Sequence, residues 1–277
     1  MRAILVPTDF SENANAAIEY ACELGIHLSA EVLIVTSHTP AITQFDHGNA
    51  LIMEETEKAR VLTEKKLSSI CKIANEQYPS LVCNYKYVVG GLVESIDTLI
   101  TTNAIDLVVM GTKGASGLDK ILFGSNTTRV IDKVNCPVLA VPRDSPFQIP
   151  RRIVYATDFH YAELDHIHEL ATIASAFKAE IMMVHITTDE KALLSEEMLK
   201  RNFAGHVRTI TDYASITYFV KYEEHITRAL ESFTTLVNAD WISMFTRKRT
   251  LFEKLYNPSR TKAMAYHSKI PLLAIKG

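Results

Sequence analysis

Four of the ten glycines in this chain fall within fourteen residues, at Gly111, Gly114, Gly117 and Gly124. They follow an apolar run, and a helical pattern comes directly after Ser125. Glycines at the end of a strand let backbone N–H groups approach a ligand closely, and a helix N-terminus favours anions. The spacing Gly-x2-Gly-x9-Gly-Ser is therefore typical of a phosphate-binding loop. A structural turn followed by a helix cap is the alternative interpretation.

Two familiar phosphate-binding patterns do not describe this loop. No Gly-Lys-Ser/Thr closes it, as a Walker A motif would require. The dinucleotide-binding fingerprint follows the first strand of its fold, whereas these glycines follow the fourth predicted strand. Glycine spacing alone therefore leaves the class of ligand open.

Short apolar runs and amphipathic helical stretches alternate through residues 1–142. The predicted strands are 2–7, 31–37, 82–89, 106–110 and 137–141, and the predicted helices are 11–28, 50–77, 92–102 and 126–134. The strands are apolar on both faces, as parallel strands covered by helices are. This pattern predicts a doubly wound α/β fold, in which ligands bind at the carboxyl ends of the strands.

The chain also contains an internal repeat. Four blocks recur in the same order, the first two pairs at an offset of 149 residues and the last two at 134: 2–10 with 151–159, 30–38 with 179–187, 103–110 with 238–245, and 136–141 with 270–275. The second copy is thus about fifteen residues shorter, between 38 and 103 of the first. We expect one domain over 1–142, a proline-rich linker over 143–150 and a second domain over 151–277.

Composition narrows the function classes. The chain has 277 residues and a formal net charge of −3, which argues against charge-driven nucleic-acid binding. No apolar run is long enough to span a bilayer, and Asp9 comes too early for a signal peptide, so we expect a cytoplasmic protein without a membrane partner. The four cysteines lack zinc-knuckle spacing and are interpreted as buried, inert thiols: Cys22, Cys71, Cys83 and Cys136.

The glycine loop, the opening VPTDF at 6–10 and the closing CPVLAVP at 136–142 resemble the universal stress protein family. The resemblance covers nearly the whole chain as two tandem copies and is closer in 1–142. It implies two tandem five-stranded parallel sheets, each in strand order 3-2-1-4-5 with helices on both faces. Members with this glycine spacing bind ATP, so the resemblance also implies ATP in the first domain, with or without Mg²⁺.

The resemblance implies a nucleotide site at specific residues. Pro7, Thr8 and Asp9 would form a wall near the ribose or adenine, and adenine would rest around Val35, Thr36 and Ser37. Thr36 is a departure, because the family often has histidine there. The ribose and phosphates would be held by the loop and the following helix, with Met110 and Thr112 completing the site: Gly111, Gly114, Gly124, Ser125, Asn126 and Thr127.

The second copy departs from the phosphate loop. At the offset of 134, Phe245 aligns with Gly111, Lys248 with Gly114 and Pro258 with Gly124, and only Ser259 keeps its counterpart. Asp158 remains at the position of Asp9. We therefore predict that this copy does not bind ATP in the family manner. Its basic cluster, Arg247, Lys248 and Arg249, is interpreted as a solvated loop, with an anion site as the alternative.

Histidines gather in the second copy, at His160, His166, His168 and His185. His160 and His185 are placed after its first and second strands, so both are expected near one edge of the sheet. Partly exposed polar histidines are the favoured interpretation and a metal site is the alternative.

The leading functional prediction is a nucleotide-binding stress or regulatory protein. One alternative is an enzyme, either a weak ATPase or a phosphoryl- or nucleotidyl-transfer catalyst, with Asp9 as an oxygen ligand for a divalent ion. Another is an interaction module that binds no nucleotide. We expect the closing strands, 136–141 and 270–275, to pair the two domains, because an unpaired sheet edge invites pairing. Homodimerisation stays open.

Overall fold

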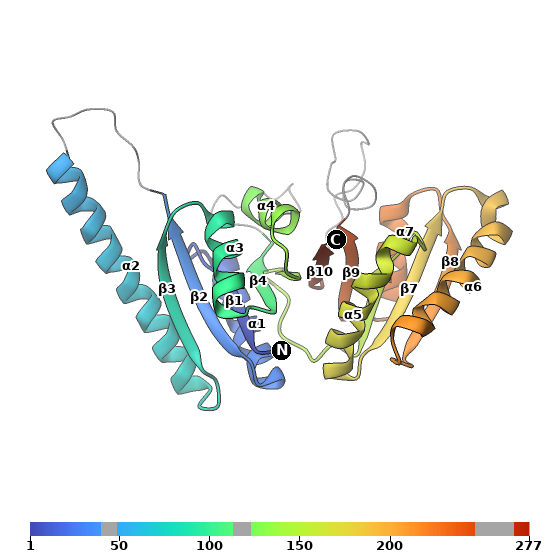
Figure 1. Cartoon of the computed structure of the whole chain (residues 1–277), viewed down its shortest axis with the longest axis horizontal. Coiled ribbons are helices and arrows are strands. Elements are labelled where there is room, and N and C mark those ends of the chain that lie inside the picture. Colours follow the sequence, from blue (N-terminus) through green and yellow to red (C-terminus); the bar gives the residue numbers. More distant parts are fainter. Residues whose placement is uncertain (40–48, 113–122, 247–268, 277) are drawn as a thin grey trace.

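The computed structural model describes residues 1–39, 49–112, 123–246 and 269–276. Within these residues the chain forms a ten-stranded sheet with helices on both faces (Figure 1). The strands are β1 (Ala3–Pro7), β2 (Glu31–His38), β3 (Cys83–Val89), β4 (Leu107–Gly111), β5 (Val138–Val141), β6 (Arg152–Ala156), β7 (Glu180–Thr187), β8 (Ile216–Tyr222), β9 (Trp241–Thr246) and β10 (Leu272–Lys276).

The helices of the first half are α1 (Glu12–Leu28), α2 (Asn49–Gln77), α3 (Leu92–Asn103) and α4 (Ser125–Lys133). Those of the second half are α5 (Leu164–Phe177), α6 (Leu193–Ile210) and α7 (Ile226–Leu236), with short 3-10 turns η1 (Tyr161–Glu163) and η2 (Glu190–Ala192). Local sequence explains the boundaries. Ser11 begins α1 by accepting a hydrogen bond from the Ala14 N–H, and Ser29 ends it in the left-handed conformation.

The strand order is β3-β2-β1-β4-β5-β10-β9-β6-β7-β8. Each half therefore has the predicted order 3-2-1-4-5, and its strands are parallel. The halves meet where β5 and β10 run antiparallel, with Leu139 opposite Leu273. The two five-stranded sheets thus form one continuous sheet, seen at the centre of Figure 1.

The sheet separates two apolar layers. Side chains of α1, α2, α5 and α6 pack on one face, and side chains of α3, α4 and α7 pack on the other. Strand β4 shows the alternation, because Leu107 and Val109 join the first layer while Val108 and Met110 join the second. Both faces of these strands are buried, as the apolar runs predicted.

The repeat is visible in the register. Gly111 pairs with Val141 in the first half, and Phe245 pairs with Ile275 in the second, which is the offset of 134 residues found in the sequence. Most of the shortening lies in the second helix, because α2 has 29 residues and its counterpart α6 has 18. Helices α2 and α6 both pack mainly along their outer strands, β3 and β8, and α6 also contacts α5.

The segment between the halves carries neither helix nor strand from Pro142 to Arg151. Side chains nevertheless connect the halves. Phe147 packs edge-on against Tyr20 at 5.1 Å between ring centroids, and the Trp241 indole N–H donates to the Tyr20 hydroxyl at 2.7 Å. The two α-layers on this face therefore share one core.

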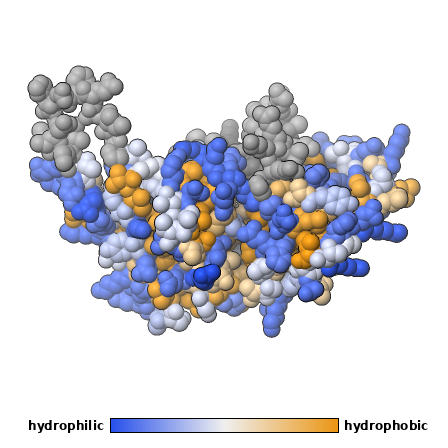
Figure 2. Space-filling model, viewed as in Figure 1, coloured by the Kyte–Doolittle hydropathy of each residue, from blue (hydrophilic) through white to orange (hydrophobic). Residues whose placement is uncertain are grey.

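Polar residues cover most of the face shown in Figure 2, with apolar residues exposed between them. This agrees with the mixed charge of the sequence, 29 basic and 32 acidic residues. Among the described helices, none combines the length and the apolar character that a bilayer-spanning segment needs.

Candidate functional site

The predicted site begins where β1 and β2 end side by side. The Thr8 N–H donates to the Val35 carbonyl at 2.8 Å, which continues the parallel ladder one residue past β1. The Thr36 hydroxyl donates a hydrogen bond to the Thr8 carbonyl at 3.0 Å. Thr8 is buried, while Thr36 and Ser37 are half-buried. These two hydrogen bonds hold the ends of β1 and β2 together. We call this surface, formed by residues 8–9 and 36–37, the ledge, and its outer side chains reach solvent.

Asp9 extends from this ledge. Its carboxylate is exposed and accepts a hydrogen bond from the Ser11 N–H at 3.0 Å, while the Thr8 hydroxyl accepts from the Phe10 N–H at 3.0 Å. Phe10 has a φ of 63°, a left-handed conformation that turns the chain from β1 into α1. This turn presents the Asp9 carboxylate at the carboxyl edge of the sheet.

Gly111 ends β4 next to this turn. A Cβ atom on Gly111 would lie 2.7 Å from the backbone oxygen of Asn13, in the first turn of α1. Such a distance is closer than real Cβ contacts, so the position accepts only glycine without a shift of α1. The first glycine of the loop thus has a packing role, in addition to any approach to a ligand.

The first turn of α4 forms the next part of the predicted site. The Gly124 N–H donates to the Thr112 carbonyl at 2.7 Å, and Gly124 then caps α4 without a side-chain hydrogen bond. Ser125 and Asn126 are exposed, whereas Thr127 is buried and its hydroxyl donates to the Gly111 carbonyl at 2.9 Å. The first turn of α4 is therefore fixed to the end of β4.

Most of the predicted residues meet at this edge of the sheet. Pro7, Val35 and Met110 are buried, so these three would face a ligand mainly with their backbone, and Thr112 is half-buried. Gly114 and Gly117 lie outside the described residues. The roles of all these residues in ligand binding stay predictions.

The sequence interpretation missed two residues that determine the backbone geometry at this edge of the sheet. Asn13 limits the space at Gly111, a contact between residues 98 positions apart that no local pattern signals. Gly90, at the end of β3, has a φ of 144° and accepts a hydrogen bond from the Thr39 hydroxyl at 3.1 Å. The Gly90-Gly91 pair was a local signal of a special backbone conformation.

The second half differs at the same register position. Phe245 occupies the place of Gly111, and its ring stacks on His166 at 4.2 Å between centroids. Burial lowers the pKa of His166, which favours the neutral ring. An aromatic pair thus stands where the first half has bare backbone. The residues aligned with Gly114 and Gly124 here, Lys248 and Pro258, lie outside the described residues, as do Arg247, Arg249 and Ser259.

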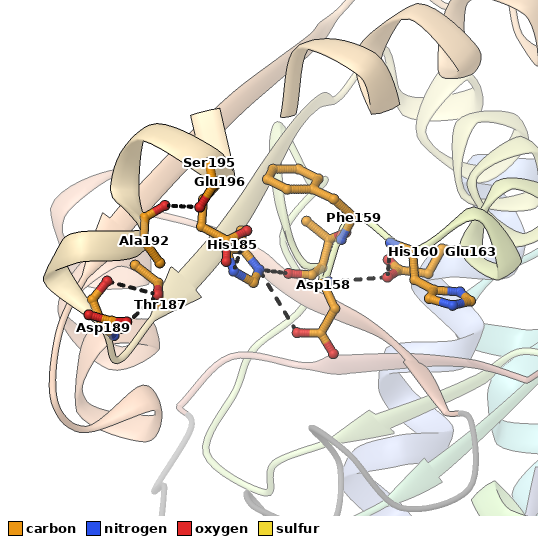
Figure 3. A network of polar contacts seen from close by, with 11 residues as sticks. Asp158, Phe159, His160, Glu163, His185, Thr187, Asp189, Ala192, Ser195 and Glu196 are labelled. Carbon is orange, nitrogen blue, oxygen red and sulfur yellow. Dashed lines mark hydrogen bonds and ion pairs between the residues drawn. The ribbon is translucent and has the colours of Figure 1, made fainter. Parts of the chain in front are cut away.

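His185 lies within β7 rather than after it, at the position of Thr36. Its Nδ1 donates to the Thr157 carbonyl at 2.9 Å, just as the Thr36 hydroxyl donates to the Thr8 carbonyl. Its Nε2 lies 3.5 Å from a carboxylate oxygen of Glu196 in α6, and a carboxylate oxygen of Asp158 lies 3.9 Å from Nδ1 (Figure 3). The second half therefore fills this ledge with a buried histidine and a carboxylate.

His160 has another role, which the predicted grouping with His185 did not anticipate. It is exposed, and its Nδ1 accepts from the Ala162 N–H at 3.1 Å at the start of η1. The Glu163 carboxylate in turn accepts from the N–H groups of Asp158 and His160 at 3.1 and 3.2 Å. Burial raises the pKa of Glu163 above its ordinary value, since only 4% of the residue is exposed.

Known proteins resemble both the sequence and the fold. Universal stress protein MJ0531 of Methanocaldococcus jannaschii is 29% identical over 144 residues, which cover 51% of this chain and 82% of that protein. Universal stress protein A homolog 1 of Coxiella burnetii is 30% identical over 145 residues, which cover 50% of this chain and 94% of that protein.

The crystal structure of a universal stress protein from Archaeoglobus fulgidus DSM 4304 superposes with a TM-score of 0.68 at 20% identity. The superposition covers 99% of this chain and 98% of that one, so the likeness in fold extends over both halves. The family model described as "Universal stress protein family" matches residues 1–142. Because this match spans just over half of the 277 residues, the chain belongs to the universal stress protein family.

Proposed function

We propose that the first half binds ATP, with or without Mg²⁺, and that the chain is a nucleotide-responsive regulatory protein of the stress response. The observation that supports this most directly is the contrast at one register position. Gly111 ends β4 without a side chain and packs closely on Asn13 of α1, whereas Phe245 places an aromatic ring at the equivalent point. A phosphate group needs the first arrangement, because it is bound by backbone N–H groups at close approach.

The donors at this edge fit a nucleotide. Gly124 caps α4 without a side-chain hydrogen bond, and the exposed hydroxyl of Ser125 and amide of Asn126 lie beside the positive end of the helix dipole. Across the strand ends, the exposed Asp9 carboxylate suits a ribose hydroxyl or a divalent cation. Thr36 and Ser37 border the ledge on which adenine would lie. Thr127 would act indirectly, by holding the Gly111 carbonyl.

We further propose that residues 151–277 form a degenerate domain that supports the first. Residues 143–150 serve as the linker, and the β5–β10 pairing serves as the interface between domains. Phe245, whose ring stacks on His166, stands at the place of Gly111 in this half, which disfavours the same ligand there. The sheet edges at β3 and β8 stay available for a homodimer.

Calorimetric titration of ATP–Mg²⁺ into the full chain tests the proposal, with one site per chain as the expected result. Gly114→Lys copies the aligned residue of the second half and should abolish binding. The matched control is Lys248→Gly, which should leave the stoichiometry unchanged. Absence of binding at millimolar ATP would overturn the nucleotide site, and two equivalent sites would overturn the degenerate second half.

Phosphate release measured on the same samples separates a binding protein from an enzyme. A regulatory binding protein should release no phosphate above the protein-free rate. Turnover that is lost in Asp9→Asn while ATP binding persists would instead support the weak ATPase, with Asp9 as the ligand of the catalytic cation.

A further inference from the structure

Three of the four cysteines converge behind the outer strand of the first half. Cys22 comes from α1, Cys71 from α2 and Cys83 from the start of β3. The Cys83 thiol donates to Cys71 at 3.2 Å between the two sulfur atoms, and it also contacts the Cys22 thiol. All three are free and buried, with exposures of 1 to 5%. Segments far apart in the sequence thus place three thiols together.

Asn75 holds this arrangement in register. Its side-chain amide donates to the Cys83 carbonyl at 3.2 Å, and its oxygen accepts from the Cys83 N–H at 3.0 Å. Asn75 lies one helical turn after Cys71, so both project from the same face of α2. Two hydrogen bonds therefore fix the backbone of Cys83 directly beside the sulfur of Cys71.

The pair is chemically unequal. The hydrogen bond from Cys83 lowers the pKa of Cys71, since it stabilises a thiolate there. The hydrogen bonds to Cys22 and Cys71 raise the pKa of Cys83, which holds its proton. A thiol of lowered pKa next to a thiol that keeps its proton is the arrangement of an attacking and a resolving cysteine.

An open groove reaches one member of the cluster, Cys22. It lies between α1 and α2, has a volume of about 690 Å³, and includes Cys22, Ile18 and Ile70 in its wall. Helix α2 packs mainly along β3 and hardly contacts α1, whereas α6 of the second half packs along β8 and also contacts α5. Cys22 thus separates the groove from the Cys83 thiol that it contacts.

We propose that Cys71 and Cys83 form a peroxide-sensitive thiol pair that closes to a disulfide. The Cys71 thiolate attacks one oxygen of a hydroperoxide and the O–O bond breaks, which leaves a sulfenic acid and a hydroxide that takes up a proton to become water. The Cys83 thiol then loses its proton, its sulfur displaces the hydroxyl group from Cys71, and that hydroxyl leaves with the proton as water. Two thiols are oxidised by two electrons, and hydrogen peroxide is reduced to two molecules of water.

Geometry favours closure. A disulfide is about 2.05 Å long, so the two sulfur atoms must approach by only about 1.2 Å. The bond would join α2 to the outer strand β3. The second half provides no equivalent, since Ala171 and Ile216 stand at the positions of Cys22 and Cys83 and residues 151–277 contain no cysteine.

Peptide mapping of the full chain after treatment with hydrogen peroxide tests this inference. Free thiols are blocked in denaturant after quenching, and intact mass gives the number blocked. We expect the free thiols to fall from four to two, with a Cys71–Cys83 cross-link in the digest. Four free thiols after treatment, or a cross-link that includes Cys22 or Cys136, would overturn it. This mapping needs no variant, so it does not depend on how substitutions fold.

Variants assign the roles. Cys83→Ser should prevent the disulfide and leave Cys71 as a sulfenic acid that a dimedone probe captures. Asn75→Ala should slow closure without changing the cross-linked pair, because Asn75 is a positioning residue. The matched control is Cys136→Ser, since Cys136 is equally buried but lies apart, with its thiol on the Ile105 carbonyl. Unchanged disulfide formation in Cys83→Ser would contradict the proposal.

Discussion

At the scale of single residues, the absence of a side chain matters most at Gly111. The glycine spacing drew attention to this position, but the spacing gave no indication of the contact with Asn13. That contact arises only when β4 and α1 pack together, so the sequence located the residue and the structure supplied its constraint. Thr127 is similar, because its predicted place at a helix start is correct while its hydroxyl is engaged by a carbonyl 16 residues earlier.

Gly111→Ala should destabilise the protein by roughly 1–3 kcal/mol, because the new methyl group must displace the start of α1. Urea unfolding measures this change. Gly205→Ala in α6 is the matched control, since a Cβ there meets nothing within 4 Å. Removing a glycine from a helix interior should stabilise the control by about 0.5–1 kcal/mol. Equal effects of the two substitutions would show that Gly111 is not constrained.

Glu163 gives the protein a pH-dependent stability. Burial raises its pKa above the ordinary value of 4.5, so the folded protein keeps a proton that the unfolded chain releases. Unfolding thus releases a proton in this window, and the contribution to stability falls as pH rises from 4.5 through the raised pKa.

Glu163→Gln should therefore become more stable relative to the parent protein as pH rises, because glutamine cannot ionise and still accepts the two backbone N–H groups. Urea unfolding between about pH 4 and about pH 8 measures the difference. The exposed Glu31 provides the control variant, Glu31→Gln. A difference between Glu163→Gln and its parent that stays constant with pH would contradict this assignment.

At the scale of elements, the sequence predicted the helices and strands that the structure describes in residues 1–142. The predicted helix 11–28 is α1 from Glu12 to Leu28, and the predicted strand 106–110 is β4 from Leu107 to Gly111. Apolar periodicity is strong in both. The different placement of α2 and α6 was not predictable, because it depends on which neighbour a helix packs against rather than on its own pattern.

Thr127→Val tests the joint between β4 and α4. Valine fills the same space but cannot donate to the Gly111 carbonyl, so we expect a loss of about 0.5–1.5 kcal/mol in stability and weaker ATP binding. Thr98→Val is the control, since its hydroxyl only bonds the preceding turn of α3 on an exposed surface. Urea unfolding and calorimetry report the two effects. An effect no larger than that of Thr98→Val would remove the joint from the proposed site.

At the scale of the whole molecule, the repeat predicted two copies and their strand order. It could not predict the Tyr20–Trp241 hydrogen bond, which joins residues 221 positions apart across the two halves. The counterpart of Trp241 in the first copy is Leu107, so the bond has no equivalent within the repeat that would reveal it. Such contacts depend on how the two copies are placed.

Tyr20→Phe should lower the free energy of unfolding by about 1–3 kcal/mol, because the buried Trp241 N–H loses its acceptor. Calorimetry should also show a broader transition as the halves become less coupled. Tyr213→Phe is the matched control, since that hydroxyl bonds the Ala179 carbonyl within one half and should change stability without broadening. A broadening in both variants would argue against a specific role of Tyr20 between the halves.

The antiparallel pairing of β5 with β10 has an evolutionary consequence. In a symmetric homodimer, every substitution appears in both subunits, so a change that impairs one site impairs the other as well. Here the two copies share a chain, and each substitution appears once. A single chain can therefore carry Phe245 in one copy and Gly111 in the other. Joining the copies allows the two halves to differ at one position while they share a sheet.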